Sequence, residues 1–214
     1  PKLDYYASHL FVNAYAIEFD PATSQLTSSE ISMFLTHRAF ITVRKDKNLD
    51  IEKAVARWDA SSDLAKNGVG FLLYGMLDYL VDSHFLAVQA LDECIDALED
   101  DLFDNASDHV AAVQRRSFDL RKSLVLLRRF VLPMREVVNG LMRRDLHVID
   151  EELMPYYQDV YDHVLRATEW TESLRDLVST ILETNLTIQS NRMNLIMKKV
   201  TSWAAVIAVP TAVT

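Results

Sequence analysis

The spacing of hydrophobic residues changes once along the chain, near residue 46. Before that point, runs rich in aromatic and β-branched residues occupy 9–19, 30–35 and 40–44, and turn-forming residues stand between them at 20–21 and 36–39. Runs of this composition and length, bounded by turn signals, are typical of β-strands. We therefore predict an antiparallel sheet in this first part of the chain.

Helical periodicity begins near Asp50 and, apart from a break at 68–70, continues to the end of the chain. Between Tyr156 and Val209 there is neither Gly nor Pro. One helix over this stretch would be about 80 Å long, because an α-helix rises about 1.5 Å per residue. That length exceeds the span of a globular domain of this size, so we expect the helix to project from its own domain.

The end of this helix is apolar. After Lys198 and Lys199, residues 200–214 carry no charge, as in a helix that passes from water into lipid. The segment is shorter than the roughly 20 residues that cross a bilayer, so we expect the beginning of a first transmembrane helix that the sequence cuts off. The patterns together predict an α+β protein: a small antiparallel-sheet α/β portion at 1–67, paired helices at 68–146, a stalk helix at 147–199 and a truncated transmembrane helix at 200–214.

The two paired helices differ sharply in charge. Residues 78–114 contain ten acidic side chains and no Lys or Arg, whereas residues 115–144 contain nine basic side chains against Asp119 and Glu136. Residues 104–107 have the composition of a turn, with Ser107 or Asp108 as the cap of the next helix. We predict a helical hairpin with an acidic arm folded on a basic arm, and two solvated faces of opposite charge remain the alternative.

Composition narrows the class of function. The net charge of −9 and the pI near 5.1 disfavour nucleic acid as a partner and favour cations. The single cysteine, Cys94, indicates a reducing, cytosolic setting, and the start of the chain carries no secretory signal. The six histidines show no zinc-finger spacing, and no Gly-rich phosphate loop or nucleophile motif is present. We therefore predict that the protein is not an enzyme.

Two pairs of aspartates are the candidate metal ligands. Asp78 and Asp82 are four residues apart in an otherwise apolar helical segment, and Asp159 and Asp162 lie near the start of the long helix. A carboxylate beside apolar neighbours usually has a positive partner or a metal ion, and no positive partner is evident nearby in sequence. Oxygen ligands suit a hard ion such as Mg²⁺. Ordinary capping or salt bridging remains the alternative.

Five blocks of sequence, at 1–11, 72–82, 133–136, 155–163 and 194–210, resemble successive blocks of the CorA family of divalent-cation channels. They cover nearly the whole chain in the family's order. The resemblance implies a homopentamer in the cell inner membrane, mostly cytoplasmic in this region, with two "willow" helices and a stalk that continues into the pore. It also implies a Mg²⁺ channel that closes when cytosolic Mg²⁺ occupies sites between subunits.

Some residues can be carried over from the family by position. Asp78 and Asp159 match carboxylates of the intersubunit sites, whose usual acidic partners would lie upstream of Pro1. The family's Gly-Met-Asn filter motif would follow Thr214, so we expect this region alone not to conduct ions and to be monomeric or weakly associated. Co²⁺ or Ni²⁺ are expected as secondary ions. The alternatives are a Zn²⁺ transporter of the same superfamily and a non-transporting, membrane-tethered helical scaffold.

A small or polar stripe follows the long helix at intervals of seven residues. Its members are Thr187, Asn194, Thr201 and Ala208. Five such helices would line a narrow channel with polar and apolar levels, and a plain coiled-coil seam is the alternative. The resemblance makes Asn194 the asparagine at the inner pore mouth and places a hydrophobic gate around Val200 and Ala208. We expect Lys198 and Lys199 to flank the membrane, as ordinary positive-inside residues, as an anchor on anionic lipid or as a basic ring.

Overall fold

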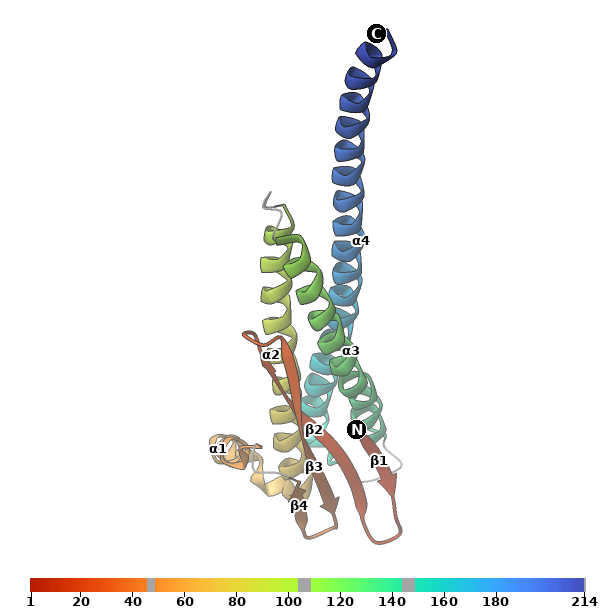
Figure 1. The fold of residues 1–214 in the computed structure, drawn as a ribbon. Helices are drawn as coiled ribbons and strands as arrows, with labels where there is room; N and C mark the ends of the chain where they lie inside the picture. Colours follow the sequence, from red (N-terminus) through yellow and green to blue (C-terminus); the bar gives the residue numbers. More distant parts are fainter. Residues whose placement is uncertain (46–48, 104–108, 144–148, 214) are drawn as a thin grey trace.

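The computed structural model describes residues 1–45, 49–103, 109–143 and 149–213, with the side chains of 102–103, 109–110 and 205–213 left out. Four antiparallel strands in the order β1-β2-β3-β4 precede the helices (Figure 1). The elements are β1 (Lys2–Tyr5), β2 (Leu10–Asp20), β3 (Gln25–Leu35), β4 (Phe40–Arg44), α1 (Ile51–Ala60), η1 (Ser62–Asn67), α2 (Gly68–Phe103), α3 (His109–Leu141), η3 (Glu151–Leu153) and α4 (Met154–Val213). The predicted α+β fold, a small antiparallel sheet followed by long helices, is confirmed.

The β2–β3 hairpin contributes opposite faces to the core at its two ends. Leu10, Val12 and Ala14 are buried on one face, whereas farther along β2 the buried residues are Ile17 and Phe19 on the other. The pairing with β3 is continuous in register, so no bulge causes the change. The twist of a long two-stranded ribbon turns its second half toward the helices.

Side chains of α2 complete one edge of β2. Strand β1 pairs with β2 only over residues 10–13. Beyond that point, the Ile17 N–H donates to Ser83 Oγ (3.0 Å), and His84 Nε2 bonds the Tyr15 carbonyl (2.8 Å). Buried backbone groups need partners, so α2 takes the place that a further stretch of β1 would otherwise fill.

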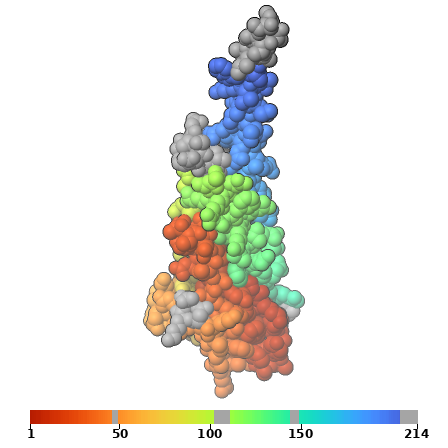
Figure 2. All heavy atoms as spheres, viewed as in Figure 1, coloured from red at the N-terminus to blue at the C-terminus, as the bar shows by residue number. Residues whose placement is uncertain are grey.

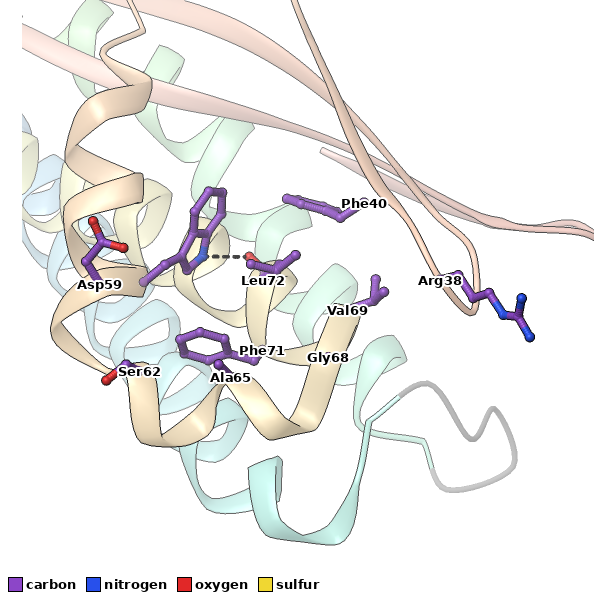
Figure 3. Close-up of a pocket in the computed structure, with 10 residues that line it drawn as sticks. Arg38, Phe40, Asp59, Ser62, Ala65, Gly68, Val69, Phe71 and Leu72 are labelled. Carbon is purple, nitrogen blue, oxygen red and sulfur yellow. Dashed lines mark hydrogen bonds between the residues drawn. The ribbon is translucent and has the colours of Figure 1, made fainter.

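Helix α1 docks on α2 through Trp58. The indole N–H of Trp58 donates to the Leu72 carbonyl (3.1 Å), and its ring meets Phe40 of β4 edge-on, with centroids 6.2 Å apart. Figure 3 shows this region, including a shallow pocket of about 420 Å³ that Phe40, Val69 and Leu72 help to line. The contact fixes α1 against the first turns of α2.

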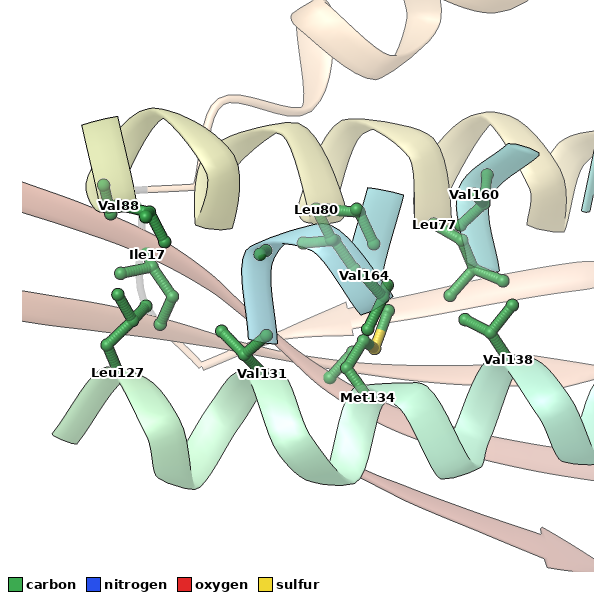
Figure 4. Packing of buried hydrophobic residues seen from close by; sticks show 14 of the residues in the cluster. Ile17, Leu77, Leu80, Val88, Leu127, Val131, Met134, Val138, Val160 and Val164 are labelled. Carbon is green, nitrogen blue, oxygen red and sulfur yellow. The ribbon is translucent and has the colours of Figure 1, made fainter. Parts of the chain in front are cut away.

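Helices α2, α3 and the first half of α4 form the helical body of the molecule. Leu80, Val131 and Val164, one from each helix, meet in the core (Figure 4). Buried positions of α4 end near Ile181 and Asn185, and from Met193 onward every α4 residue with a described side chain is exposed. At 60 residues, α4 is about 90 Å long. The prediction that this helix projects from its domain is confirmed (Figures 1 and 2).

Charge does not hold the α2–α3 hairpin together. Among the described residues, one ion pair joins the two arms, between Arg116 and Asp101 at 3.6 Å. Arg128 pairs instead with Glu172 of α4. The acidic arm is folded on the basic arm as a hairpin, but the single ion pair between their described residues favours the alternative of two solvated faces of opposite charge. The predicted turn at 104–107 and its cap at Ser107 or Asp108 lie outside the described residues.

Candidate metal centre and stalk helix

Two helices bring three potential metal ligands together. Asp78 and Asp82, one turn apart on α2, and His163 on α4 each place a ligand atom within 4.8 Å of the others. All three side chains are half-buried. The predicted pair Asp78 and Asp82 therefore shares one site, and α4 adds an imidazole that the sequence analysis had not selected. Two carboxylates and one imidazole are a donor set that suits a divalent cation.

Arg57 of α1 already supplies positive charge to this site. One of its guanidinium nitrogens donates to Asp78 Oδ2, and the other donates to Asp82 Oδ2 at 2.5 Å. Its guanidinium also lies over the Tyr79 ring, 5.7 Å from the centroid. The partner that the sequence did not reveal is thus a residue on a different helix. Without a metal ion, Arg57 neutralises the carboxylates in part.

Burial and negative charge raise the pKa values of neighbouring groups. The pKa of Asp78 is raised above its ordinary value, chiefly by burial and further by Asp82, and Arg57 opposes this shift. Burial, with the charges of Asp78 and Asp159, raises the pKa of Tyr74 to about 12. The charges of Asp78 and Asp159 therefore both act on Tyr74.

The second predicted pair, Asp159 and Asp162, does not belong to the cluster that contains Asp78 and Asp82. Asp159 and Asp162 are both exposed on α4. Asp162 accepts a hydrogen bond from Gln158 Nε2 (3.2 Å) and is not part of the cluster. Asp159 precedes His163 by one turn and so shares its side of the helix. This four-residue spacing is the signal that could have pointed to His163.

An aromatic seam holds α2 and α4 in register at this site. Tyr74 meets Tyr156 with ring centroids 5.5 Å apart, and Phe85 meets Trp170 at 5.3 Å. The buried Tyr157 hydroxyl donates to the Gly70 carbonyl (2.8 Å). These contacts lie on both sides of the cluster along the helices, so the positions of Asp78 and His163 are fixed by packing.

The predicted pore-lining residues lie on the projecting part of α4. Thr187, Asn194 and Thr201 are exposed on one side of the helix, and the two threonine hydroxyls donate to carbonyls one turn earlier (3.0 and 2.8 Å). The side chain of Ala208 lies outside the described residues. Val200 is 58% exposed, and Lys198 and Lys199 are exposed beside it. Further exposed apolar side chains of this segment are Leu186, Met193, Leu195, Ile196, Met197 and Trp203.

By length and composition, one helical stretch of the described residues, Ser62–Asp101, is apolar enough to cross a membrane. Its most apolar window is 56% buried. This stretch consists of η1 and most of α2, whose apolar side chains pack against the sheet and the other two long helices.

The chain thus combines a sheet packed on two long helices with a third helix that projects from them. The structure is similar to the complete structure of the CorA magnesium transporter from Methanocaldococcus jannaschii, with a TM-score of 0.80 and 24% identity, covering 100% of this chain and 66% of that one. Residues 1–214 match the family described as CorA-like Mg²⁺ transporter protein. The chain belongs to this family.

The relatives of this chain are named for different ions. The cobalt/magnesium transport protein CorA of Thermotoga maritima is 30% identical over 209 residues, which are 96% of this chain and 58% of that protein. The zinc transport protein ZntB of Yersinia pestis is 23% identical over 205 residues, 92% of this chain and 60% of that protein. The chain therefore spans about three-fifths of the length of these relatives.

Proposed function

We propose that this chain is the cytosolic gating region of a homopentameric Mg²⁺ channel of the inner membrane. The observation that carries the proposal is the Asp78–Asp82–His163 cluster at the base of α4, the same helix whose far end exposes an apolar surface. Family membership supports the assignment. The function is transport rather than catalysis, and nucleic acid has no part in it.

Carboxylates near the subunit boundary would act as the sensor. Asp159 is exposed one turn before His163 of the cluster, so an ion held here can also take ligands from a neighbouring copy. Like charges on adjacent subunits repel, and a bound divalent ion offsets that repulsion. Mg²⁺ then shifts the population toward a tightly packed ring, and its loss loosens the ring.

The long helix would carry this change to the pore. The α4 helix is continuous from Met154 to Val213, so a tilt at its base moves its far end. Thr187, Asn194 and Thr201 line the path in this proposal, and Val200 and Ala208 form its apolar constriction. Lys198 and Lys199 lie at the membrane face, and the apolar end of α4 enters lipid.

Zn²⁺ is the second candidate ion, and one observation favours it. His163 joins the two carboxylates in the cluster, and imidazole is a common zinc ligand but an unusual one for Mg²⁺. The similarity to ZntB is in keeping with this reading. Co²⁺ and Ni²⁺, which also accept imidazole, are secondary ions under either assignment.

The deciding experiment measures ion uptake by the full-length protein in liposomes. Influx of Mg²⁺ that falls when Mg²⁺ is supplied on the cytosolic side supports the proposal. Influx of Zn²⁺ without Mg²⁺ would transfer the assignment to zinc. If no ion enters, the chain is a membrane-tethered scaffold.

A protease assay tests the sensor separately. In the full-length protein, Asp159→Ala should weaken the protection of α4 that Mg²⁺ provides, whereas Glu169→Ala, an exposed carboxylate on the same helix, should leave it intact. Equal protection in both variants would remove Asp159 from the sensor.

A further inference from the structure

Two oppositely charged surfaces of the helical body form no ion pairs with the part of the chain that the structure describes. The acidic face of α2 consists of the exposed residues Glu93, Asp96 and Asp100, and the basic face of α3 consists of the exposed residues Arg115, Arg121, Lys122 and Arg129. Among the described residues, no member of either face forms an ion pair, and the one salt bridge between the arms uses Asp101 and Arg116.

The acidic face of α2 carries repulsion between its own members, and the basic face of α3 carries an excess of positive charge. Asp96 stands three residues after Glu93 and four before Asp100, and like charges at these spacings on a helix repel by about 0.2–0.5 kcal/mol per pair. The pKa of the neighbouring Asp92 is raised, first by burial and then by the charges of Asp96 and Glu93. On α3, Asp119 is the one carboxylate among the basic residues of this stretch. A surface of opposite charge would relieve both faces.

The basic face is also shaped to receive a partner. Phe118 is 53% exposed and Val125 is 38% exposed. With Leu126 and three of the basic residues, they line a shallow groove of about 490 Å³ on the outside of α3. Figure 2 shows this part of α3, in green, on the open surface of the body. Apolar side chains within a charged rim are typical of an interface.

The two faces lie at the same height along the body. The ion pair between Asp101 and Arg116 places these two positions level with each other. The two helices run antiparallel, so counting five residues back from Asp101 on α2 and five forward from Arg116 on α3 reaches the same level. Asp96 is therefore level with Arg121. In the same way, Asp100 lies close to the level of Arg115, and Glu93 lies close to the level of Lys122. Rotation about an axis parallel to the helices preserves height, so it leaves the acidic residues of one copy at the level of the basic residues of the next.

We infer that the acidic face of α2 in one copy of this chain binds the basic face of α3 in the neighbouring copy. The contact joins two different surfaces, so repetition around an axis closes a ring. The inference rests on the proposed function only for the ring assembly. It adds which helices meet and explains why charge is separated by helix although the arms do not pair with each other.

Cysteine cross-linking in the full-length protein tests the contact. Cys94, which is buried, is first replaced by Ala. One chain then carries Glu93→Cys and a second carries Lys122→Cys, and membranes containing both are treated with a short bismaleimide. A covalent dimer is expected when both chains are present and not with either chain alone, because the contact joins unlike faces. Glu52→Cys, an exposed position on α1, replaces Glu93→Cys in the control and should give no dimer.

Charge reversal makes the test specific. Asp96→Lys with Asp100→Lys in the first chain should lower the cross-linking yield about tenfold, since two attractive levels become repulsive. Arg115→Glu with Arg121→Glu in the second chain should restore the yield. A dimer between identical chains, a yield no higher than the control, or no response to charge reversal would each overturn the inference.

The same membranes separate this inference from the proposed function. An intact oligomer that still takes up ions but gives no cross-link would overturn the α2–α3 contact and leave the channel assignment standing. A cross-linked assembly that takes up no ion would support the α2–α3 contact and overturn the channel assignment. Binding of vesicles rich in anionic lipid that is lost with the Arg115→Glu and Arg121→Glu changes, without any cross-link, would assign the basic face to lipid instead.

Discussion

His84 is a buried residue whose ionisation links stability to pH. Its side chain is fully buried, Nε2 bonds the Tyr15 carbonyl, and Nδ1 has no hydrogen-bond partner. Burial lowers its pKa from 6.5 to about 4. Between these values the unfolded chain binds a proton that the folded chain does not. The contribution of neutral His84 to the free energy of unfolding is therefore complete above about pH 6.5 and is lost as the pH falls toward 4.

Between pH 7.5 and pH 5, urea unfolding should therefore show a fall of about 2 kcal/mol in the free energy of unfolding from this residue, since about 1.4 kcal/mol is lost per pH unit inside its window. In His84→Gln, which can still donate to Tyr15, the fall should be much smaller. Asp78 has the opposite effect, because its pKa is raised above the ordinary value of 3.8 by burial and the folded chain therefore holds its proton more tightly. An equally steep fall in His84→Gln would assign the acid sensitivity to other groups.

Arg57 is the residue that competes with a metal ion. Arg57→Met removes both ion pairs and leaves Asp78, with its side chain 22% exposed, beside Asp82 without a neutralising charge. We expect the free energy of unfolding to fall by about 1–3 kcal/mol in the absence of divalent ions. We also expect a divalent ion to raise the melting temperature of this variant more than that of the unchanged chain.

Lys53→Met is the matched control for Arg57→Met. Lys53 is an exposed residue on the same helix and forms no ion pair in the described structure. Its loss should change neither the stability nor the response to ions. If ions stabilise all three proteins equally, the Asp78–Asp82 site does not bind them.

At the scale of elements, Gly75 lets α1 approach α2. A Cβ atom built at this position would overlap the Trp58 ring, which is held by its bond to Leu72. Gly75→Ala should therefore lower the free energy of unfolding by about 1–3 kcal/mol, although alanine favours a helix by up to about 1 kcal/mol. In a Trp58→Leu background the same change should cost little. A double-mutant cycle from thermal or urea unfolding measures the difference, and additive effects would contradict the overlap.

The elements were largely predictable, whereas their contacts were not. The strands and the long α4 helix follow from local patterns that each segment carries by itself, such as the absence of Gly and Pro from 156–209. The Arg57 partner of Asp78 and the placement of His163 depend on how distant helices pack, which periodicity does not encode. The change of buried face within β2 was missed for the same reason, because it depends on where the helices meet the sheet.

Charge was the misleading signal at this scale. The acidic and basic stretches seemed complementary within one hairpin, yet each helix turns its apolar stripe inward and its charges outward. Leu98 and Leu120, both fully buried, illustrate what joins the arms. The charges are therefore free to contact another molecule.

At the scale of the whole molecule, the body and the projecting end of α4 should behave as separable parts. The last buried α4 residues are Ile181 and Asn185, and Ile188 is half-buried. From Met193 onward every described side chain of the helix is exposed, including Met193 and Trp203, which are 63% and 69% accessible. Exposed apolar surface of this extent is costly in water and marks a contact with lipid or protein.

A chain ending at residue 190 should therefore unfold with the same midpoint as residues 1–214 kept in detergent, and it should stay dispersed without detergent. A chain ending at residue 176 is the matched control. It loses the buried Val178 and Ile181, and removal of core side chains of this size costs about 2–5 kcal/mol each, so its melting temperature should fall by more than about 10 °C. Circular dichroism gives the midpoints and light scattering gives the molecular mass. If the chain ending at 190 loses stability as the control does, the end of α4 packs on the body, and its apolar surface is not available to a membrane.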